Sequence, residues 1–201
     1  ITLNNFSYIM ANVITIKKGL DINLKGKAPE SMLKAGKSAT YAIVPNYYTG
    51  IVPKVVVRPG DKVKAGSALM TDKNRPEIKF VSPVSGEVVA VNRGEKRKVL
   101  SIVVKPDAQI EYENFGKKNV SSLKAEEVKA ELLNAGMWPF IKQRPYDIVA
   151  SPSDSPRDIF VTAFNSAPLA PNFDFLVKGN EADLQAGLDA LAKLTNGKVY
   201  V

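Results

Sequence analysis

Hydrophobic and polar positions change their period partway along the chain. Between residues 13 and about 113, short apolar runs alternate with turn residues about every ten positions. This spacing is typical of short strands in a β-sandwich or barrel. Residues 28–35 are the one stretch in this part that indicates a helical turn. The predicted strands are 13–16, 41–44, 55–57, 69–70, 78–81, 88–91 and 99–104.

After residue 119 the apolar period becomes helical. Ala125, Val128 and Leu132 share one helical face, and Gly136 follows as a stop signal. The start of this helix is less clearly marked, because Ser122 is a possible cap but Lys124 is a poor one. A second helix is predicted from Asn180, which is a good capping residue, with an apolar face and an end near 196–197. The leucines on that face are Leu184, Leu188 and Leu191.

Strands are expected on either side of the second helix. Residues 159–164 have the apolar composition of a buried strand, and residues 199–201 begin another. Helix, strand, helix and strand in this order indicate a layered α/β domain with a partly parallel sheet. Two or three strands are few for such a sheet, so we expect this domain to be incomplete in the chain.

A glycine motif predicts the fold of the first part. Gly60 and Gly66 permit two reversals around Val63, and a Ser-Pro-x-x-Gly turn follows at 82–86. This pattern resembles that of biotinyl and lipoyl carrier domains and implies a barrel-sandwich hybrid. A carrier would need a modified lysine on a hairpin, for which Lys73 is the candidate. Lys73 lies nine residues before Ser82, so carrier function stays an alternative.

Composition excludes much of enzyme chemistry. The chain has 201 residues with no Cys and no His, so thiolate nucleophiles, Ser-His-Asp triads and Cys-based metal sites are impossible within it. The net charge of +8 is uneven: residues 1–118 carry 20 basic and 10 acidic residues, and residues 119–201 carry 8 and 10. The lysines are scattered and no nucleic-acid motif accompanies them, so we expect no nucleic-acid partner.

Several segments together carry a longer resemblance. They are 16–22, 50–53, 72–74, 91–100, 135–138 and 164–171. In this order they resemble the A subunit of the bacterial Na+-translocating NADH:quinone oxidoreductases, over about residues 14–201. The resemblance implies a peripheral subunit on the cytoplasmic face of the inner membrane, without transmembrane helices of its own. It also implies partner subunits that hold the flavins and the iron–sulfur centre, and an association with quinone.

The same resemblance directs attention to residues 136–142. The family is similar in fold to the flavin-carrying subunit of respiratory complex I, whose glycine-rich loop binds flavin phosphate. Here the corresponding loop has one glycine, Trp138 and Phe140 fill space, and Pro139 lacks an N–H donor. We therefore expect no cofactor in this chain. Trp138 has two interpretations, a core or interface anchor and a quinone-stacking aromatic, and Phe140 shares the second.

A charged reversal is the other candidate site. Arg93, Glu95, Lys96 and Arg97 follow Asn92 on a predicted hairpin tip. Solvated surface charge is one interpretation. Docking to another subunit or to lipid headgroups is the other, because arginine binds carboxylate or phosphate through two parallel hydrogen bonds.

We therefore predict an α+β chain with two domains. A barrel-sandwich hybrid occupies residues 10–118, and an incomplete α/β Rossmann-like domain occupies 119–201; residues 1–9 are an upstream extension or a remnant of an expression vector. The expected function is a structural, quinone-binding or partner-binding subunit of a sodium-pumping reductase. A flavin- or NADH-binding enzyme module and a biotinyl or lipoyl carrier are the alternatives, and a periplasmic adaptor is disfavoured because no signal peptide is visible.

Overall fold

Two antiparallel sheets form the first part of the molecule. The computed structural model describes residue 19, residues 24–26 and residues 29–201, so the predicted strand at 13–16 and the extension at 1–9 lie outside the described residues. The larger sheet has the order β1-β7-β6-β3 and the smaller one β2-β4-β5. Their strands are β1 (Tyr41–Ile43), β2 (Pro53–Val55), β3 (Lys62–Val63), β4 (Ala68–Asp72), β5 (Lys79–Val81), β6 (Gly86–Arg93) and β7 (Val99–Pro106).

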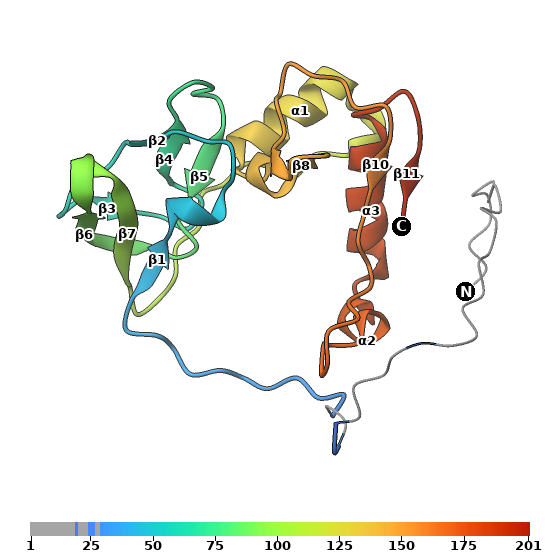
Figure 1. Ribbon diagram of the computed structural model, residues 1–201, viewed down its shortest axis with the longest axis horizontal. Helices are drawn as coiled ribbons and strands as arrows, with labels where there is room; N and C mark the ends of the chain where they lie inside the picture. The colour runs from blue at the N-terminus through green and yellow to red at the C-terminus, as the bar shows by residue number, and fades with distance from the viewer. Residues whose placement is uncertain (1–18, 20–23, 27–28) are drawn as a thin grey trace.

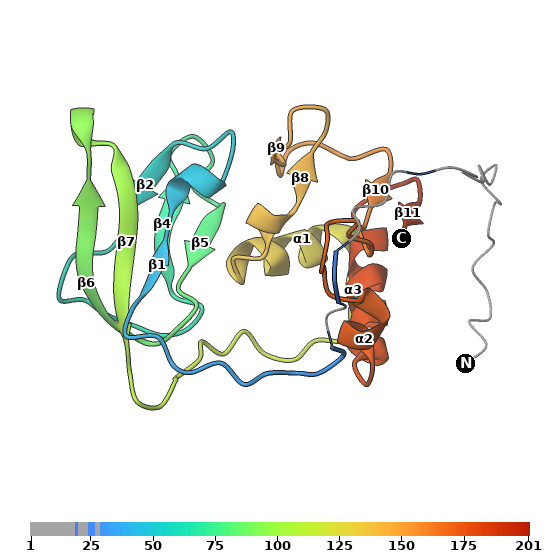
Figure 2. The same cartoon turned by 60° about the horizontal axis from the view of Figure 1, so that its bottom comes forward.

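The two sheets lie face to face (Figures 1 and 2), and buried side chains from both belong to one hydrophobic cluster. Leu69 and Met70 of β4, Val88 of β6 and Ile102 of β7 have no exposed surface, and Tyr48 packs edge-to-face on Phe80 with 4.6 Å between ring centroids. One face of each sheet therefore contributes to a common core. In β4, a register shift between Ala68 and Met70 departs from strict alternation, and the consecutive residues Leu69 and Met70 are both buried. The barrel-sandwich class is confirmed for this part of the chain.

Helices and short strands form the second part. A 3-10 turn, η3 (Val120–Ser122), precedes α1 (Ala125–Asn134), and a second one, η4 (Trp138–Phe140), follows it. A hairpin of β8 (Lys142–Gln143) and β9 (Ile148–Val149) comes next. The remaining elements are β10 (Ile159–Phe160), α2 (Phe173–Val177), α3 (Glu181–Ala192) and β11 (Val199–Tyr200).

The ends of α1 have clear local causes. The Glu127 carboxylate accepts a hydrogen bond from the Lys124 backbone N–H at 2.7 Å, so the helix begins after Lys124 and not after Ser122. At the other end, the N–H of Met137 donates to Leu132 O at 2.9 Å and the N–H of Gly136 donates to Leu133 O. This is a Schellman motif, which requires the left-handed backbone that Gly136 adopts at φ 69°.

The second predicted helix exists with altered ends. Asn180 precedes α3 as predicted, but its side chain makes no capping hydrogen bond, and the helix ends at Ala192, four residues before Asn196. Lys193 just beyond that end donates from Nζ to Ser121 O at 3.0 Å, which ties α3 to η3. The short helix α2 was not predicted, because its five residues are too few to show a helical period.

The predicted parallel pairing is present between β10 and β11, with Ile159 opposite Val199 and Phe160 opposite Tyr200. The buried character expected for 159–164 is wrong, since Phe160 is 70% exposed. Its ring stacks instead on Tyr200, with 4.9 Å between centroids. A strand in a two-stranded sheet has an uncovered face, whereas the apolar composition is typical of strands covered on both faces.

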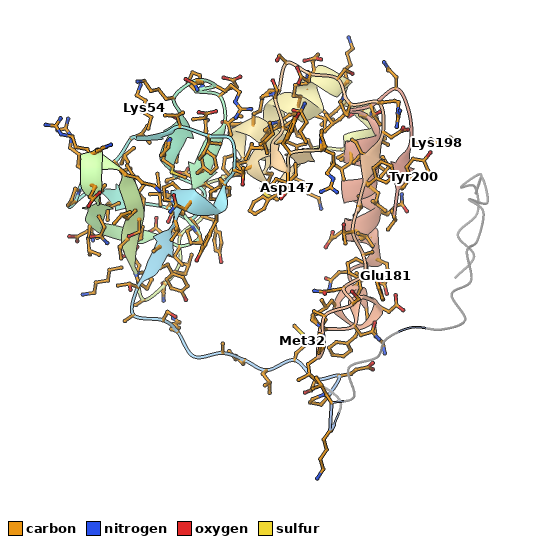
Figure 3. The ribbon with its side chains drawn as sticks, in the orientation of Figure 1. Met32, Lys54, Asp147, Glu181, Lys198 and Tyr200 are labelled. Atoms are coloured by element: carbon orange, nitrogen blue, oxygen red, sulfur yellow. The ribbon has the colours of Figure 1, made fainter. Side chains whose placement is uncertain are left out.

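A long extended segment precedes β1 and reaches the second part of the molecule. Residues 29–40 are exposed throughout and run from α2 to β1 in Figure 1. Asn172 donates to Glu30 at 3.2 Å, and Figure 3 places Met32 near α2. The helical turn predicted within 28–35 is wrong for residues 29–35. Met32 and Leu33 are 80% and 90% exposed, so little packing would stabilise so short a helix. Ala28 lies outside the described residues.

Candidate functional site

The charged reversal is a hydrogen-bonded turn at the tip of the β6–β7 hairpin. Arg93 pairs with Val99, and the turn is closed by hydrogen bonds from Gly94 N–H to Lys98 O at 2.8 Å and from Lys98 N–H to Glu95 O at 3.0 Å. Nη1 of Arg93 donates to Arg97 O at 3.2 Å. The side chains of this tip are therefore exposed on a well-defined backbone. We call residues 93–98 the basic tip, and it includes Lys98 in addition to the four residues predicted from the sequence.

The basic tip contains two backbone positions of an unusual kind. Lys96 and Arg97 have φ angles of 52° and 60°, a left-handed conformation that glycine and asparagine normally supply. Here a lysine and an arginine adopt this left-handed conformation, which costs free energy because of steric repulsion at the Cβ atom.

Trp138 lies in η4, the turn that follows α1, and belongs to the buried cluster of the barrel. Its indole is 4% exposed, and Nε1–H donates to Ala150 O at 2.9 Å. Gly136 just before it packs so closely on β5 that a Cβ atom would lie 2.4 Å from Cγ1 of Val81. The loop that would correspond to a phosphate-binding loop is thus a packed junction between α1 and the barrel, with no open backbone N–H cluster at this turn.

Phe140 differs from Trp138 in every respect that matters for binding. Its ring is 68% exposed, whereas the Trp138 indole is buried in the barrel core and already hydrogen-bonded. The structure therefore does not bring the two aromatic rings together as one stacking surface. It also separates both from the basic tip, since η4 contacts β5 and β9 and the tip ends the β6–β7 hairpin.

A buried ion pair stands beside this junction and was not identified from the sequence. Asp72 has no exposed surface, and its Oδ2 accepts from Nε of Arg75 at 2.7 Å. Its Oδ1 accepts from the backbone N–H of Val52 at 3.0 Å and of Asn74 at 3.2 Å. Every oxygen of the carboxylate is therefore satisfied, as burial of a charge requires.

The Arg75 guanidinium extends this pair across the molecule. Nη1 donates to Val149 O at 3.1 Å and Nη2 donates to Gly50 O at 2.9 Å. We call Asp72 and Arg75 with these two carbonyls the arginine clamp. The Asp-x-x-Arg spacing in a turn was the only local signal, and the Val149 acceptor lies 74 residues farther along the chain. Lys73, the carrier candidate, is exposed in the same turn.

A shallow hollow of about 270 Å³ lies on the barrel and carries mixed charge. Lys62 pairs with Glu87 at 3.1 Å and Lys64 with Glu111 at 3.5 Å, so its lysines already have acidic partners. Its lining residues are Lys62, Val63, Lys64, Ser85, Asp107 and Glu111. Within the part of the chain that the structure describes, no group of three or more acidic side chains is placed to hold a metal ion.

The electrostatics of the β10–β11 pair centre on Asp158. Its Oδ1 accepts from the Lys198 N–H at 3.0 Å and its Oδ2 accepts from Nε of Arg157 at 2.9 Å. The backbone hydrogen bond from Lys198, followed by that from Arg157, lowers the pKa of the Asp158 carboxyl below its ordinary value. The charged form of Asp158 therefore links the two parallel strands.

None of the helices in residues 29–201 is both long and apolar enough to cross a bilayer.

Comparison with known proteins defines the class of each part. Residues 14–107 match the family described as the NqrA N-terminal barrel-sandwich hybrid domain. Residues 123–201 match the NqrA second alpha/beta domain. The predicted fold class is confirmed by these two matches. The predicted boundary at residues 118 and 119 falls between the matched ranges and stays a prediction.

Curated relatives then give the particular family of subunits. The A subunit of the Na(+)-translocating NADH-quinone reductase of Vibrio vulnificus strain YJ016 is 40% identical over 192 residues, which cover 94% of this chain and 43% of the relative. The corresponding proteins of Photorhabdus laumondii and Serratia proteamaculans are 38% and 37% identical, with the same coverage. The chain belongs to the family of these A subunits, and it spans less than half the length of the curated relatives it matches.

Proposed function

We propose that this chain forms a structural part of the A subunit in a sodium-translocating NADH-quinone reductase, on the cytoplasmic face of the membrane, without a redox cofactor of its own. The packed junction at Gly136 and Trp138 carries this proposal. A dinucleotide or flavin phosphate needs free backbone N–H groups and room for the backbone to approach, and here a buried indole and Val81 fill that room. What the turn does instead is join α1 and the β8–β9 hairpin to the barrel.

The test uses the full-length subunit. Purified alone, it is expected to show no flavin absorbance, no bound iron and no NADH oxidation. Added to a complex assembled without it, it is expected to restore NADH-driven quinone reduction and sodium transport. Stoichiometric flavin in the isolated subunit would contradict the cofactor-free role. Full activity of the complex without the subunit would contradict the structural role.

A second role at the same junction is a quinone contact, and the exposed ring of Phe140 supports it. A planar ring that is 68% exposed beside a rigid core offers a stacking surface for another planar group. Phe140→Leu is expected to raise the KM for quinone of the assembled reductase and to leave the KM for NADH unchanged. An equal KM for quinone in the wild-type reductase and in the Phe140→Leu variant would show that Phe140 is an exposed residue without a role in quinone binding.

The carrier alternative has its own test, because Lys73 is exposed in the β4–β5 turn. The intact mass of protein purified from its native cells distinguishes the two functions. We expect an unmodified mass, since Asp72 beside Lys73 serves the arginine clamp and the family matched is not a carrier family. A mass increase of a biotinyl or lipoyl group on Lys73 would establish the alternative.

A further inference from the structure

The basic tip has the charge of an anion-binding surface. Its six residues include Arg93, Lys96, Arg97 and Lys98 against the single carboxylate of Glu95. Elsewhere on the barrel, Lys62 and Lys64 have acidic partners, in the pairs Lys62–Glu87 and Lys64–Glu111. Among the described residues, no ion pair includes a side chain of the tip. Four cations are therefore held together with one anion to offset them.

The backbone of the tip favours a binding role over solvated charge. Lys96 and Arg97 are both held left-handed, where asparagine or glycine would relieve the strain. Non-glycine residues in this conformation cluster at sites where side-chain placement matters. Here the chain keeps two long cations at the strained positions. Nη1 of Arg93 also donates to Arg97 O, which adds a side-chain hydrogen bond to the backbone hydrogen bonds that close the turn.

The position and composition of the tip indicate what kind of surface it meets. Figure 2 shows the β6–β7 hairpin on the side of the molecule away from α1 and α3, with its turn at the end of the barrel. A stable protein interface buries about 800 Å² on each partner around apolar anchors. Residues 93–98 are few and none is a large apolar residue. A layer of lipid phosphates requires only accessible cations, and arginine binds phosphate with two parallel hydrogen bonds.

We infer that the basic tip docks on anionic lipid headgroups at the membrane surface. This inference rests on the proposed function for its cellular setting, because only a subunit of a membrane complex would meet such a surface. The contact orients the barrel with the β6–β7 hairpin toward the bilayer. It adds to the attachment that partner subunits provide, since each basic residue near an anionic membrane contributes modestly.

The experiment measures co-sedimentation of the 201-residue chain with phosphatidylcholine vesicles that contain or lack phosphatidylglycerol at about a third of the lipid. The tip variant combines Arg93→Gln, Lys96→Asn and Arg97→Asn, since asparagine tolerates the left-handed backbone. The control variant combines Lys25→Gln, Lys34→Gln and Lys178→Gln, which removes the same charge from exposed positions elsewhere. Thermal melting by circular dichroism confirms that each variant is folded.

The wild-type chain is expected to bind the anionic vesicles and not the neutral ones, and less as salt rises. The tip variant should bind about a hundredfold more weakly, and the control variant within a few-fold of the wild type. Equal losses in both variants would overturn the inference, because diffuse charge would then explain binding. The inference would also be overturned if the wild-type chain does not bind the anionic vesicles. If, in that case, the tip variant also fails to join detergent-solubilised partner subunits, the tip binds an acidic protein instead of lipid. The vesicle test contains no partner proteins, so the proposed function can fail separately.

Discussion

Arg75 holds a turn of the barrel to a segment that lies far away in the sequence. Its three donor groups serve Asp72, Val149 O and Gly50 O. Arg75→Ala leaves the Asp72 carboxylate buried with only its backbone donors, and we expect the free energy of unfolding to fall by about 3 kcal/mol. Arg75→Lys keeps the charge but not the planar set of donors, so it should lose about 1–2 kcal/mol.

Chemical denaturation followed by circular dichroism measures both effects. Arg58→Ala is the matched control, since Arg58 is exposed on the same barrel and should change stability by no more than about 0.5 kcal/mol. If Arg75→Ala and Arg58→Ala were equally stable, the clamp would be a surface contact that the folded state does not need.

Trp138 is the only tryptophan of the chain, so its fluorescence reports on this single site. With 4% of its surface exposed, we expect emission at short wavelength and weak quenching by acrylamide. Trp138→Ala should lower the free energy of unfolding by about 3–5 kcal/mol, because it removes a large buried ring. Phe140→Ala two residues later should change it by no more than about 0.5 kcal/mol. Emission typical of exposed indole would refute the anchor role.

Sequence reasoning located individual residues unevenly, and the reason is physical. The packing role of Trp138 was one of two interpretations, because an aromatic next to a helix stop is suited to both core and ligand. The arginine clamp was invisible, since its acceptors are backbone carbonyls at Gly50 and Val149 that no residue type marks. The charges of the basic tip were evident, but the strained backbone under Lys96 and Arg97 was not.

At the scale of elements, the end of α1 depends on one glycine. Gly136 has φ 69°, and a Cβ there would lie 2.4 Å from Val81 Cγ1 and 2.9 Å from Val81 Cγ2. Gly136→Ala should therefore cost at least about 2 kcal/mol, from backbone strain and from overpacking. The double variant with Val81→Ala should lose less than the two single changes together, because the clash is removed.

Gly187 provides the opposite case within a helix. It lies inside α3, and a Cβ there would meet no atom within 4 Å. Gly187→Ala should stabilise the protein by about 0.5–1 kcal/mol, since alanine restricts the unfolded chain. Thermal melting of Gly136→Ala and Gly187→Ala compares the two effects, since we expect the melting temperature to fall in the first variant and to rise in the second. A rise in both would show that the packing at Gly136 is looser than described.

The elements that sequence predicted well are those whose pattern and surroundings agree. The strands of the barrel have a period of two and one buried face, and all seven of β1 to β7 pair in antiparallel fashion. The errors occur where an apolar segment has no neighbouring element that covers it. Residues 29–35 have a helix-like composition but are exposed throughout, and Phe160 is an aromatic residue with 70% of its surface exposed on an uncovered strand. Local pattern cannot reveal whether a surface is covered.

At the scale of the whole molecule, the two parts share a core. Trp138 and Val149 belong to the same buried cluster as Leu69, Phe80 and Ile102 of the barrel. We expect residues 10–118 to unfold cooperatively on their own, because they contain both barrel sheets. They should nevertheless be less stable than residues 10–150 by about 2 kcal/mol or more, since the longer piece restores the burial of two core side chains.

Urea denaturation of the two pieces tests this expectation. A molten state of residues 10–118, without a cooperative transition, would show that the predicted boundary near residue 119 is wrong. Equal stability of the two pieces would show that the shared core contributes little and that the parts are independent.

The shared core also has a consequence for synthesis on the ribosome. All barrel strands have been made once Pro106 is added, but Trp138 and Val149 follow about 32 and 43 residues later. At translation rates of about 5–20 residues per second, the nascent barrel waits for several seconds with β5 uncovered. During that interval its apolar surface is available to chaperones and to other nascent chains. Synonymous codons that slow translation between residues 107 and 149 should therefore reduce the yield of folded protein more than the same codons placed after residue 150.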